Sequence, residues 1–279
     1  MYRQLHRLEE EGLEVAAVDG HSDEIVNNIE QEIDERTSAI MLSRIYFESG
    51  VINQHISEIA ALARKHDIPF MIDDYHGTNV VPLSIQDENL EDCFILIGGY
   101  KYLQWGEGNC FLRFPKDCEL RPAVTGWFAS FSSLDKPRDD GPVTYDDGNQ
   151  RFATGTYDPA SQFRAAKVVE FFEDQGLTPT VLRRQYLNQV SLLKELFLEQ
   201  DFDAEIIKLR HQRPLERNGG FLALQSPFAR TIRAKLMDNG VFTDARGDIL
   251  RFGPAPYITS DQIRQAMHSL GEIVENLNP

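Results

Sequence analysis

The amino-acid sequence predicts an α/β protein with a mostly parallel sheet, followed by a smaller α+β part. Two observations predict this fold class. Up to Phe114, short apolar runs alternate with amphipathic helical patterns, which is typical of βαβ units with helices on both faces of the sheet. Beyond residue 158, long helical patterns and a few short strands take over. With 279 residues, the chain is long enough to build a large hydrophobic core.

The first 114 residues contain the predicted parallel sheet. Apolar side chains recur every three or four residues in three segments, so we expect helices at residues 2–8, 22–33 and 56–66. Gly12 is a typical stop for the first of these helices, and Ser22 can cap the second. Apolar, β-rich runs predict strands at residues 13–18, 39–42, 69–73, 93–97 and 110–114.

The second half of the chain begins with an irregular stretch. Residues 115–158 are rich in Pro, Gly, Asp and Ser and show little periodicity, so we expect a long functional or mobile loop. The helix expected next has an apolar face of Ala165, Val168, Val169 and Phe172. The remaining pattern predicts helices at 160–175, 180–199, 227–239 and from 260, and strands at 204–209, 220–224 and around Val241 and Leu250.

Composition and charge exclude several function classes. The formal net charge of −16 would repel a polyanion, so nucleic acid is not an expected partner. No apolar run approaches the roughly 18 residues that a membrane span needs. Three cysteines without a CxxC spacing favour neither a disulfide framework nor a zinc site, and they suit a reducing cytoplasm. The seven histidines show no metal-ligand spacing.

Lys101 follows a buried strand that ends in Gly98-Gly99, and aromatic residues flank it on both sides. Lysine is unusual at the rim of a buried sheet. One interpretation is an amine held in a pocket so that it can form a Schiff base. The other is a surface lysine in a hairpin turn. The stretch alone does not decide between the two interpretations.

Asp73 ends another buried strand, at the sheet edge where open α/β sheets bind their ligands. A buried carboxylate there needs a cationic partner, and a protonated pyridine nitrogen would supply one. The alternative is a turn or helix cap built from the aspartate and Gly77.

Three further residues are candidates for binding anions or anchoring the loop. Thr156 precedes a helix that begins after Pro159, where a hydroxyl and free N–H groups either bind a phosphate or simply cap the helix. Arg251 lies in an apolar strand and can clamp a carboxylate, which belongs either to a substrate or to a structural aspartate. Trp127 lies in the first part of the irregular stretch and is more typical of a small local core than of a ligand contact.

These segments together resemble the class V branch of the pyridoxal-phosphate enzymes, and kynureninase most of all. The similarity runs in the right order along nearly the whole chain. It rests on Asp73-x-x-His76, Tyr100-Lys101-Tyr102-Leu103 with Gly106-x-Gly108, Gly126-Trp127-Phe128, Gly240-Val241 with Asp244-x-Arg246, and Leu250-Arg251-Phe252-Gly253 with Pro256.

The resemblance implies the aspartate-aminotransferase fold, with a large cofactor-binding domain at residues 1–176 and a small α+β domain at 177–279. It implies pyridoxal 5'-phosphate as cofactor and Lys101 as the Schiff-base lysine and proton-shuttling base. Asp73 would pair with the pyridinium nitrogen, His76 would support the ring, and Tyr100 would hydrogen-bond the phosphate.

The resemblance also implies residues that act from outside this cluster. Trp127 and Thr156 would approach the phosphate from a neighbouring subunit, which implies a homodimer with shared sites. Arg251 would hold the α-carboxylate of an amino-acid substrate. Asp158 stands where kynureninases carry an Asn that helps recognise the aromatic end of the substrate, so the substrate can differ here.

The expected activity is a kynureninase-like hydrolase that cleaves a Cβ–Cγ bond. An aminotransferase or lyase of the same fold is the alternative, and a catalytically inactive homologue is a third. A desulfurase is disfavoured, because it needs a mobile cysteine late in the chain and no cysteine follows Cys118. The family's phosphate-cup Ser/Thr and ring-stacking aromatic would precede Met1, so we expect the chain to be truncated at its N-terminus.

Overall fold

The larger of two sheets has four strands in the order β1-β2-β3-β4. The structure is a computed structural model that describes residues 6–137, 141 and 143–277. Strands β1 to β3 are parallel, whereas β4 pairs with β3 in antiparallel fashion. The mostly parallel sheet of the predicted α/β class is therefore confirmed. Its strands are β1 (Ile40–Ser43), β2 (Phe70–Asp73), β3 (Phe94–Gly98) and β4 (Cys110–Arg113).

Two helices cover this sheet, α2 (Ile25–Glu32) and α3 (Ile56–Lys65). Their apolar faces join the strands in one buried cluster, in which Ile59 and Ile72 are fully buried. Burying such side chains contributes about 1.5–3 kcal/mol each. The predicted helical spacing is thus confirmed, and it supports the strands that carry the candidate site residues at their ends.

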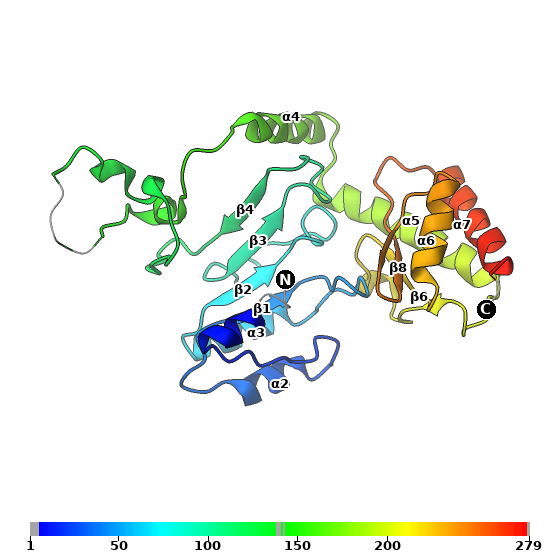
Figure 1. Ribbon diagram of the computed structural model, residues 1–279, viewed down its shortest axis with the longest axis horizontal. Helices are drawn as coiled ribbons and strands as arrows, with labels where there is room; N and C mark the ends of the chain where they lie inside the picture. The colour runs from blue at the N-terminus through cyan, green and yellow to red at the C-terminus, as the bar shows by residue number, and fades with distance from the viewer. Residues whose placement is uncertain (1–5, 138–140, 142, 278–279) are drawn as a thin grey trace.

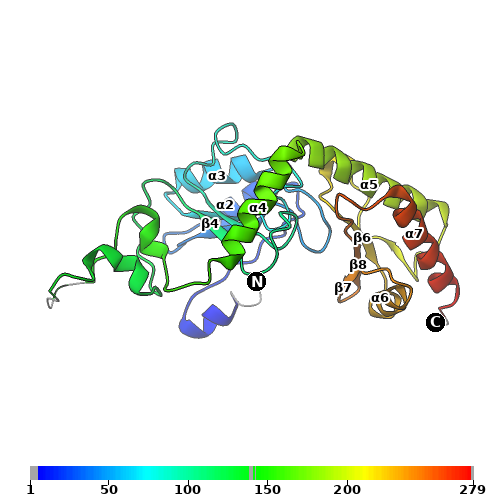
Figure 2. The same cartoon turned by 90° about the horizontal axis from the view of Figure 1, so that it is seen from above.

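The segment between β4 and the C-terminal part projects from the rest of the molecule (Figures 1 and 2). It contains the short 3-10 helices η2 (Trp127–Ser133) and η3 (Gly148–Phe152), and we call residues 115–158 the arm. Helix α4 (Ala160–Asp174) follows it. The apolar face predicted for α4 does not form a core, since Ala165 is its one buried residue and Val169 is exposed. Periodicity predicted the helix correctly, but it could not show that the face is covered only in part within the described residues, where Phe172 packs against the cluster of Val80, Leu182 and Tyr186.

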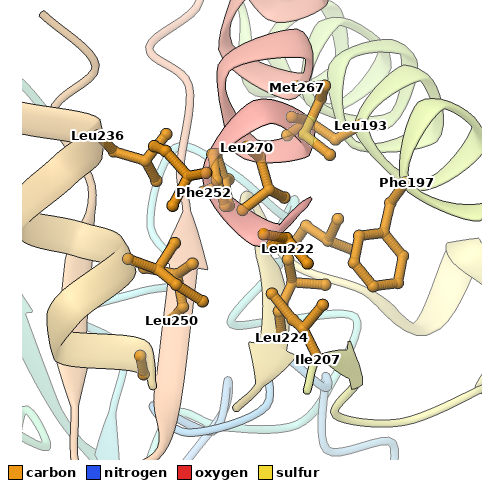
Figure 3. Packing of buried hydrophobic residues seen from close by; sticks show 14 of the residues in the cluster. Leu193, Phe197, Ile207, Leu222, Leu224, Leu236, Leu250, Phe252, Met267 and Leu270 are labelled. Atoms are coloured by element: carbon orange, nitrogen blue, oxygen red, sulfur yellow. The ribbon is translucent and has the colours of Figure 1, made fainter. Parts of the chain in front are cut away.

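The second sheet is antiparallel, with the order β5-β6-β8-β7. Three helices pack on it and form the core in Figure 3. This confirms the predicted α+β C-terminal part. The strands are β5 (Lys208–Leu209), β6 (Leu222–Gln225), β7 (Asp244–Arg246) and β8 (Ile249–Phe252), and the helices are α5 (Pro179–Glu199), α6 (Ala229–Asp238), α7 (Ser260–Glu275) and the 3-10 turn η4 (Leu215–Arg217).

The two sheets meet at a buried junction. Ile45 and Ile52 from the first part pack with Phe221 and Ile249 from the second. Tyr102, which follows the lysine turn, packs edge-on against Tyr186 of α5 with ring centroids 5.4 Å apart. This junction brings the carboxyl end of β3 close to β6 and β8. The division into domains at residue 176 stays a prediction.

Several predicted elements differ from the structure. Residues 13–18 form no strand, because no neighbouring strand pairs with them and most of their side chains remain exposed. The strand expected at 204–209 shrinks to β5 after a turn, and Val241 precedes β7 instead of lying in a strand. At the N-terminus, Tyr2 and Leu5 lie outside the described residues, and the predicted helix ends as η1 (Leu8–Glu11) with Gly12 in the left-handed conformation at φ 85°.

No helix in the described part of the chain is long and apolar enough to cross a membrane.

Candidate functional site

Lys101 lies in the connection between β3 and β4, in a turn that two glycines make possible. A Cβ on Gly98 would come within 2.4 Å of the Tyr75 ring, and one on Gly99 within 2.5 Å of the Asn109 carbonyl oxygen. The Gln104 N–H donates to the Lys101 carbonyl at 3.0 Å, which closes the turn. The connection is a hairpin, as one interpretation proposed, but Lys101 is partly buried rather than a free surface residue.

The Lys101 amine has an environment that favours its neutral form. Burial is the largest cause, and the nearby Arg251 guanidinium adds to it, so the pKa of Lys101 is lowered from its ordinary value. Its Nζ lies 5.2 Å from the centre of the Tyr100 ring. No carboxylate in the described residues forms an ion pair with it, although Asp244 and Asp73 are close enough to oppose the shift. A lowered pKa increases the fraction of neutral lysine, which is the form that acts as a nucleophile or base.

Asp73 is the last residue of β2 and its carboxylate is partly buried. It accepts hydrogen bonds from the Ser43 hydroxyl at 3.2 Å and from the Tyr75 N–H at 3.1 Å. The second bond is the turn contact of the alternative interpretation. The same carboxylate still contributes to the field around Lys101, so a turn role and a ligand role are compatible here.

His76 lies between two aromatic rings at the junction of the sheets. Its ring centroid is 5.8 Å from that of Phe47 and 6.0 Å from that of Phe221, both in edge-on geometry. Burial, and then the positive charges of Lys101 and Arg251, lower the pKa of His76 to about 3. The imidazole is therefore neutral at physiological pH and can act as a flat, uncharged support.

Arg251 of β8 does have a carboxylate partner, and that partner is structural. In the β7–β8 pair Asp244 lies directly opposite it, and its Nη2 donates to the Asp244 Oδ2. Its Nη1 donates to the Phe47 carbonyl at 3.1 Å, and the guanidinium stacks 4.0 Å from the Phe47 ring centroid. Among the described residues, the buried Nε of Arg251 has no hydrogen-bond partner. We call Arg251 with Asp244 and Phe47 the arginine socket; its unpaired Nε could bind a second anion.

Tyr102 is a site residue that sequence reasoning missed. Burial raises the pKa of its hydroxyl well above the ordinary value. A Cβ added at Gly220 would lie 2.9 Å from the Tyr102 ring. The backbone carbonyl of Tyr102 accepts a hydrogen bond from the Asn79 side chain at 3.2 Å. The residue thus anchors the lysine turn against the C-terminal part. The sequence signal was an aromatic residue directly after the lysine.

The charged pair that supports this edge of the sheet involves Asp74 rather than Asp73. Its carboxylate is 1 % exposed and receives the Arg44 guanidinium in a two-point contact at 2.5 and 3.0 Å. Thr78 adds a third hydrogen bond at 2.5 Å. Burial raises the pKa of Asp74, and Arg44 opposes that shift. The fully buried carboxylate with a cationic partner at this edge is therefore Asp74, and the pairing of Asp73 with a pyridinium nitrogen stays a prediction.

The remaining three candidates lie in or beside the arm. Trp127 is 50 % exposed and stacks on Phe128 with centroids 4.3 Å apart. A Cβ on Gly155 would lie 3.5 Å from the Trp127 Nε1, so the tryptophan is beside the segment that carries Thr156. Asp158 is exposed, and its carboxylate accepts from the Ala160 N–H at 2.9 Å at the start of α4.

The structure therefore forms two separate groups of candidate residues. The group around Lys101 combines an amine of lowered pKa, carboxylates, a neutral imidazole and an arginine socket. It can bind a carboxylate at one end and hold a carbonyl-bearing cofactor at the other, and its residues fit pyridoxal phosphate at the ring and aldehyde. The group in the arm supplies a hydroxyl and an indole. No cluster of His, Cys, Asp or Glu in the described residues could hold a metal ion.

Comparisons with known proteins agree with this architecture. Residues 182–270 match the family described as the kynureninase C-terminal domain. A 122-residue stretch, 43% of this chain, is 26% identical to a mitochondrial cysteine desulfurase of Eremothecium gossypii, of which it covers 24%.

Solved structures show the same fold over almost the whole chain. A NifS-like protein superposes with a TM-score of 0.74 at 14% identity, covering 99% of this chain and 72% of the other. A cysteine desulfurase from Thermococcus onnurineus gives 0.78 at 15%, covering 99% and 70%. A cystine C-S lyase in complex with cysteine persulfide gives 0.73 at 15%, covering 88% and 64%. The fold is that of the class V aminotransferase-like enzymes, whose cofactor is pyridoxal 5'-phosphate.

Proposed function

We propose that this chain, which has the class V aminotransferase-like fold, is a pyridoxal-phosphate-dependent enzyme acting on an amino acid. The observation that carries the proposal is the meeting of Lys101, His76 and Arg251 at the junction of the two sheets. These residues come from the β3–β4 turn, from the end of β2 and from β8. Structural needs alone do not require a partly buried lysine without an ion-pair partner beside an arginine socket.

Each residue of the group has a definite task in this proposal. Lys101 would hold the cofactor at its aldehyde and would take up and pass on a proton at its Nζ; its lowered pKa favours the neutral amine that this requires. Asp73 would accept a hydrogen bond from the cofactor's ring nitrogen and would stabilise its protonated form. His76 would support the ring, and Tyr100 would donate to the phosphate. Arg251 would bind the substrate carboxylate. The cofactor itself, when bound, supplies the electron sink for a carbanion.

The reaction we propose is kynureninase-like hydrolysis of a Cβ–Cγ bond, supported by the match of residues 182–270 to the kynureninase C-terminal domain. A lyase or aminotransferase is the second candidate, because the structural neighbours include a cystine C-S lyase. A desulfurase is disfavoured because no cysteine follows Cys118 in this sequence, although a cysteine desulfurase is found both among the relatives and among the structural neighbours. At the N-terminal end of α4, Asp158 would contact the distal end of the substrate.

We also propose that the active enzyme is a homodimer with shared sites. Among the described residues, no hydrogen bond, ion pair or ring contact joins the arm to the Lys101 group of the same chain, and the arm projects from the rest of the molecule (Figure 2). Trp127 and Thr156 would therefore serve the phosphate of a second copy. In this arrangement residues 1–176 form the cofactor-binding domain and 177–279 the small domain. A cytoplasmic location stays a prediction.

Absorbance spectroscopy tests the cofactor assignment. The purified chain mixed with pyridoxal phosphate should show the yellow band of the lysine-bound cofactor. Lys101→Ala should abolish the band, whereas Lys116→Ala, at an exposed arm lysine, should leave it unchanged. A band that survives in Lys101→Ala, or no band in the parent chain, would reject the proposal.

Two further measurements test the reaction and the dimer. Alanine released from kynurenine without a keto acid supports the hydrolase, whereas turnover that requires a keto acid supports the aminotransferase. Mixing Lys101→Ala chains with Trp127→Ala chains should restore part of the cofactor band through hybrid dimers. Failure of the mixture, when each variant alone is folded, would argue for sites built within one chain.

A further inference from the structure

A surface pocket of the C-terminal part lies between α6 and the edge strand β7, which run side by side in Figure 2. Its volume is about 390 Å³. Arg230 and Arg233 of α6 line one wall, and Arg246 of β7 lines the other together with Ala245 and Gly247. Three guanidinium groups thus line the same pocket. Two come from residues about one turn apart on α6, and the third comes from the neighbouring strand β7.

The positive charge of this pocket is largely unneutralised. Within the described ranges, no carboxylate forms an ion pair with Arg230 or Arg233. Arg233 donates through Nε to the Thr243 carbonyl at 3.3 Å, which fixes the base of its side chain and leaves its terminal nitrogens available. In a chain with a net charge of −16, a local group of three arginines, of which only Arg246 has a carboxylate partner among the described residues, reverses the sign of the general field.

Arg246 connects the pocket to the arginine socket described above. Its Nη1 lies 2.9 Å from the Asp244 Oδ1, while the other oxygen of that carboxylate accepts from Arg251. Asp244 and Arg246 are two residues apart on β7, so their side chains lie on the same face of the strand. One carboxylate therefore balances two guanidinium groups, and Arg246 can exchange Asp244 for an anion in the pocket.

We propose that this pocket is a binding site for a small dianion of phosphate type, and that Arg246 divides its charge between that anion and Asp244. Planar guanidinium groups bind tetrahedral phosphate oxygens in pairs, which suits three arginines around one anion. The size of the pocket fits inorganic phosphate or a phosphate monoester. The overall negative field disfavours a nucleic acid as the occupant. Phosphate binding in this pocket requires neither Lys101 nor a cofactor, although the pocket is linked to Arg251 through the carboxylate of Asp244.

Calorimetric titration of the full chain with inorganic phosphate, without pyridoxal phosphate, tests the pocket. Binding should saturate at one site and weaken as ionic strength rises. The pair of substitutions Arg230→Ala and Arg233→Ala removes two charge-assisted contacts and should weaken phosphate binding at least tenfold. Arg264→Ala, at an exposed arginine of α7, is the matched control and should bind as the parent does. Circular dichroism verifies that all variants are folded.

Asp244→Asn tests the sharing of Arg246. Removing the competing carboxylate should tighten phosphate binding several-fold, and Arg246→Ala should cancel that gain. No saturable binding in the parent, or equal affinity in the Arg230/Arg233 double variant, would overturn the site. An unchanged affinity in Asp244→Asn would overturn the link to Asp244.

Discussion

Acidification should destabilise the cofactor-free protein through His76. In the folded protein this histidine titrates at a pKa of about 3, because burial between Phe47 and Phe221 and the charges of Lys101 and Arg251 disfavour the imidazolium. In the unfolded chain the pKa returns to the ordinary value of 6.5. Between these values the unfolded state binds more protons, so the free energy of unfolding falls as the pH falls. The contribution is fully present above pH 6.5.

The magnitude follows from the gap between the two pKa values. A pH of about 5 lies about 1.5 units below the pKa of the histidine in the unfolded chain, whereas the folded histidine is still neutral there. At 1.36 kcal/mol per unit, the free energy of unfolding falls by about 2 kcal/mol. Urea unfolding at about pH 7.5 and pH 5 measures it. His76→Gln cannot titrate, so its loss of unfolding free energy over this interval should be smaller than the parent's by about 2 kcal/mol.

A matched control separates this effect from general acid destabilisation. His268 is exposed on α7, where its Nε2 lies 3.6 Å from a Glu272 carboxylate oxygen. His268→Gln should keep most of the parent's pH dependence. If His76→Gln and the parent lose the same unfolding free energy between the two pH values, the neutral, buried imidazole described above is wrong.

Two other predictions concern packing around the site. Asp74→Asn leaves the buried Arg44 guanidinium without its counter-ion, so urea unfolding should show a loss of about 3–5 kcal/mol, and a loss below about 1 kcal/mol would contradict the buried pair. Gly220→Ala places a methyl group 2.9 Å from the Tyr102 ring, which should cost about 1–3 kcal/mol of stability and weaken the cofactor absorbance band. Gly253→Ala is the control, since its nearest atom would be at an ordinary 3.4 Å; equal effects of the two substitutions would refute the close approach.

Local periodicity predicted the elements that bury a face within this chain. Helix α7 is an example, because its apolar stripe and its capping box at Thr259 both follow from residues that are close together in the sequence. The strand predicted at residues 13–18 failed for the opposite reason, since a strand needs a paired neighbour, which no local pattern reveals. The apolar face of α4 likewise predicted burial, but Val169 on that face is 38 % exposed. Sequence reasoning therefore predicts elements better than it predicts what covers them.

In the candidate site, too, local sequence indicated some features and not others. Residue types at strand ends indicated that Lys101 and a carboxylate lie close together, and Asp73 is near enough to act on the charge of Lys101. The Schiff-base role of Lys101 stays a prediction. The aspartate that carries a buried cationic partner turned out to be Asp74, because alternation along β2 and the following turn sets which neighbour points inward. One residue of register decides this, and periodicity does not fix register to one residue.

The pairing of Arg251 shows what register adds to the proposed mechanism. Antiparallel pairing of β7 with β8 places Asp244 directly opposite, so the guanidinium has a counter-charge before any substrate arrives. Without that carboxylate, a cation with 10 % of its side chain exposed would lack compensation, which is costly. A substrate carboxylate that displaces Asp244 exchanges one ion pair for another, and the released aspartate keeps Arg246 as partner at 2.9 Å. Arg251 therefore stays charge-balanced before and after binding, so the proposed substrate is selected by how well its carboxylate competes with Asp244 rather than by neutralisation of a bare charge.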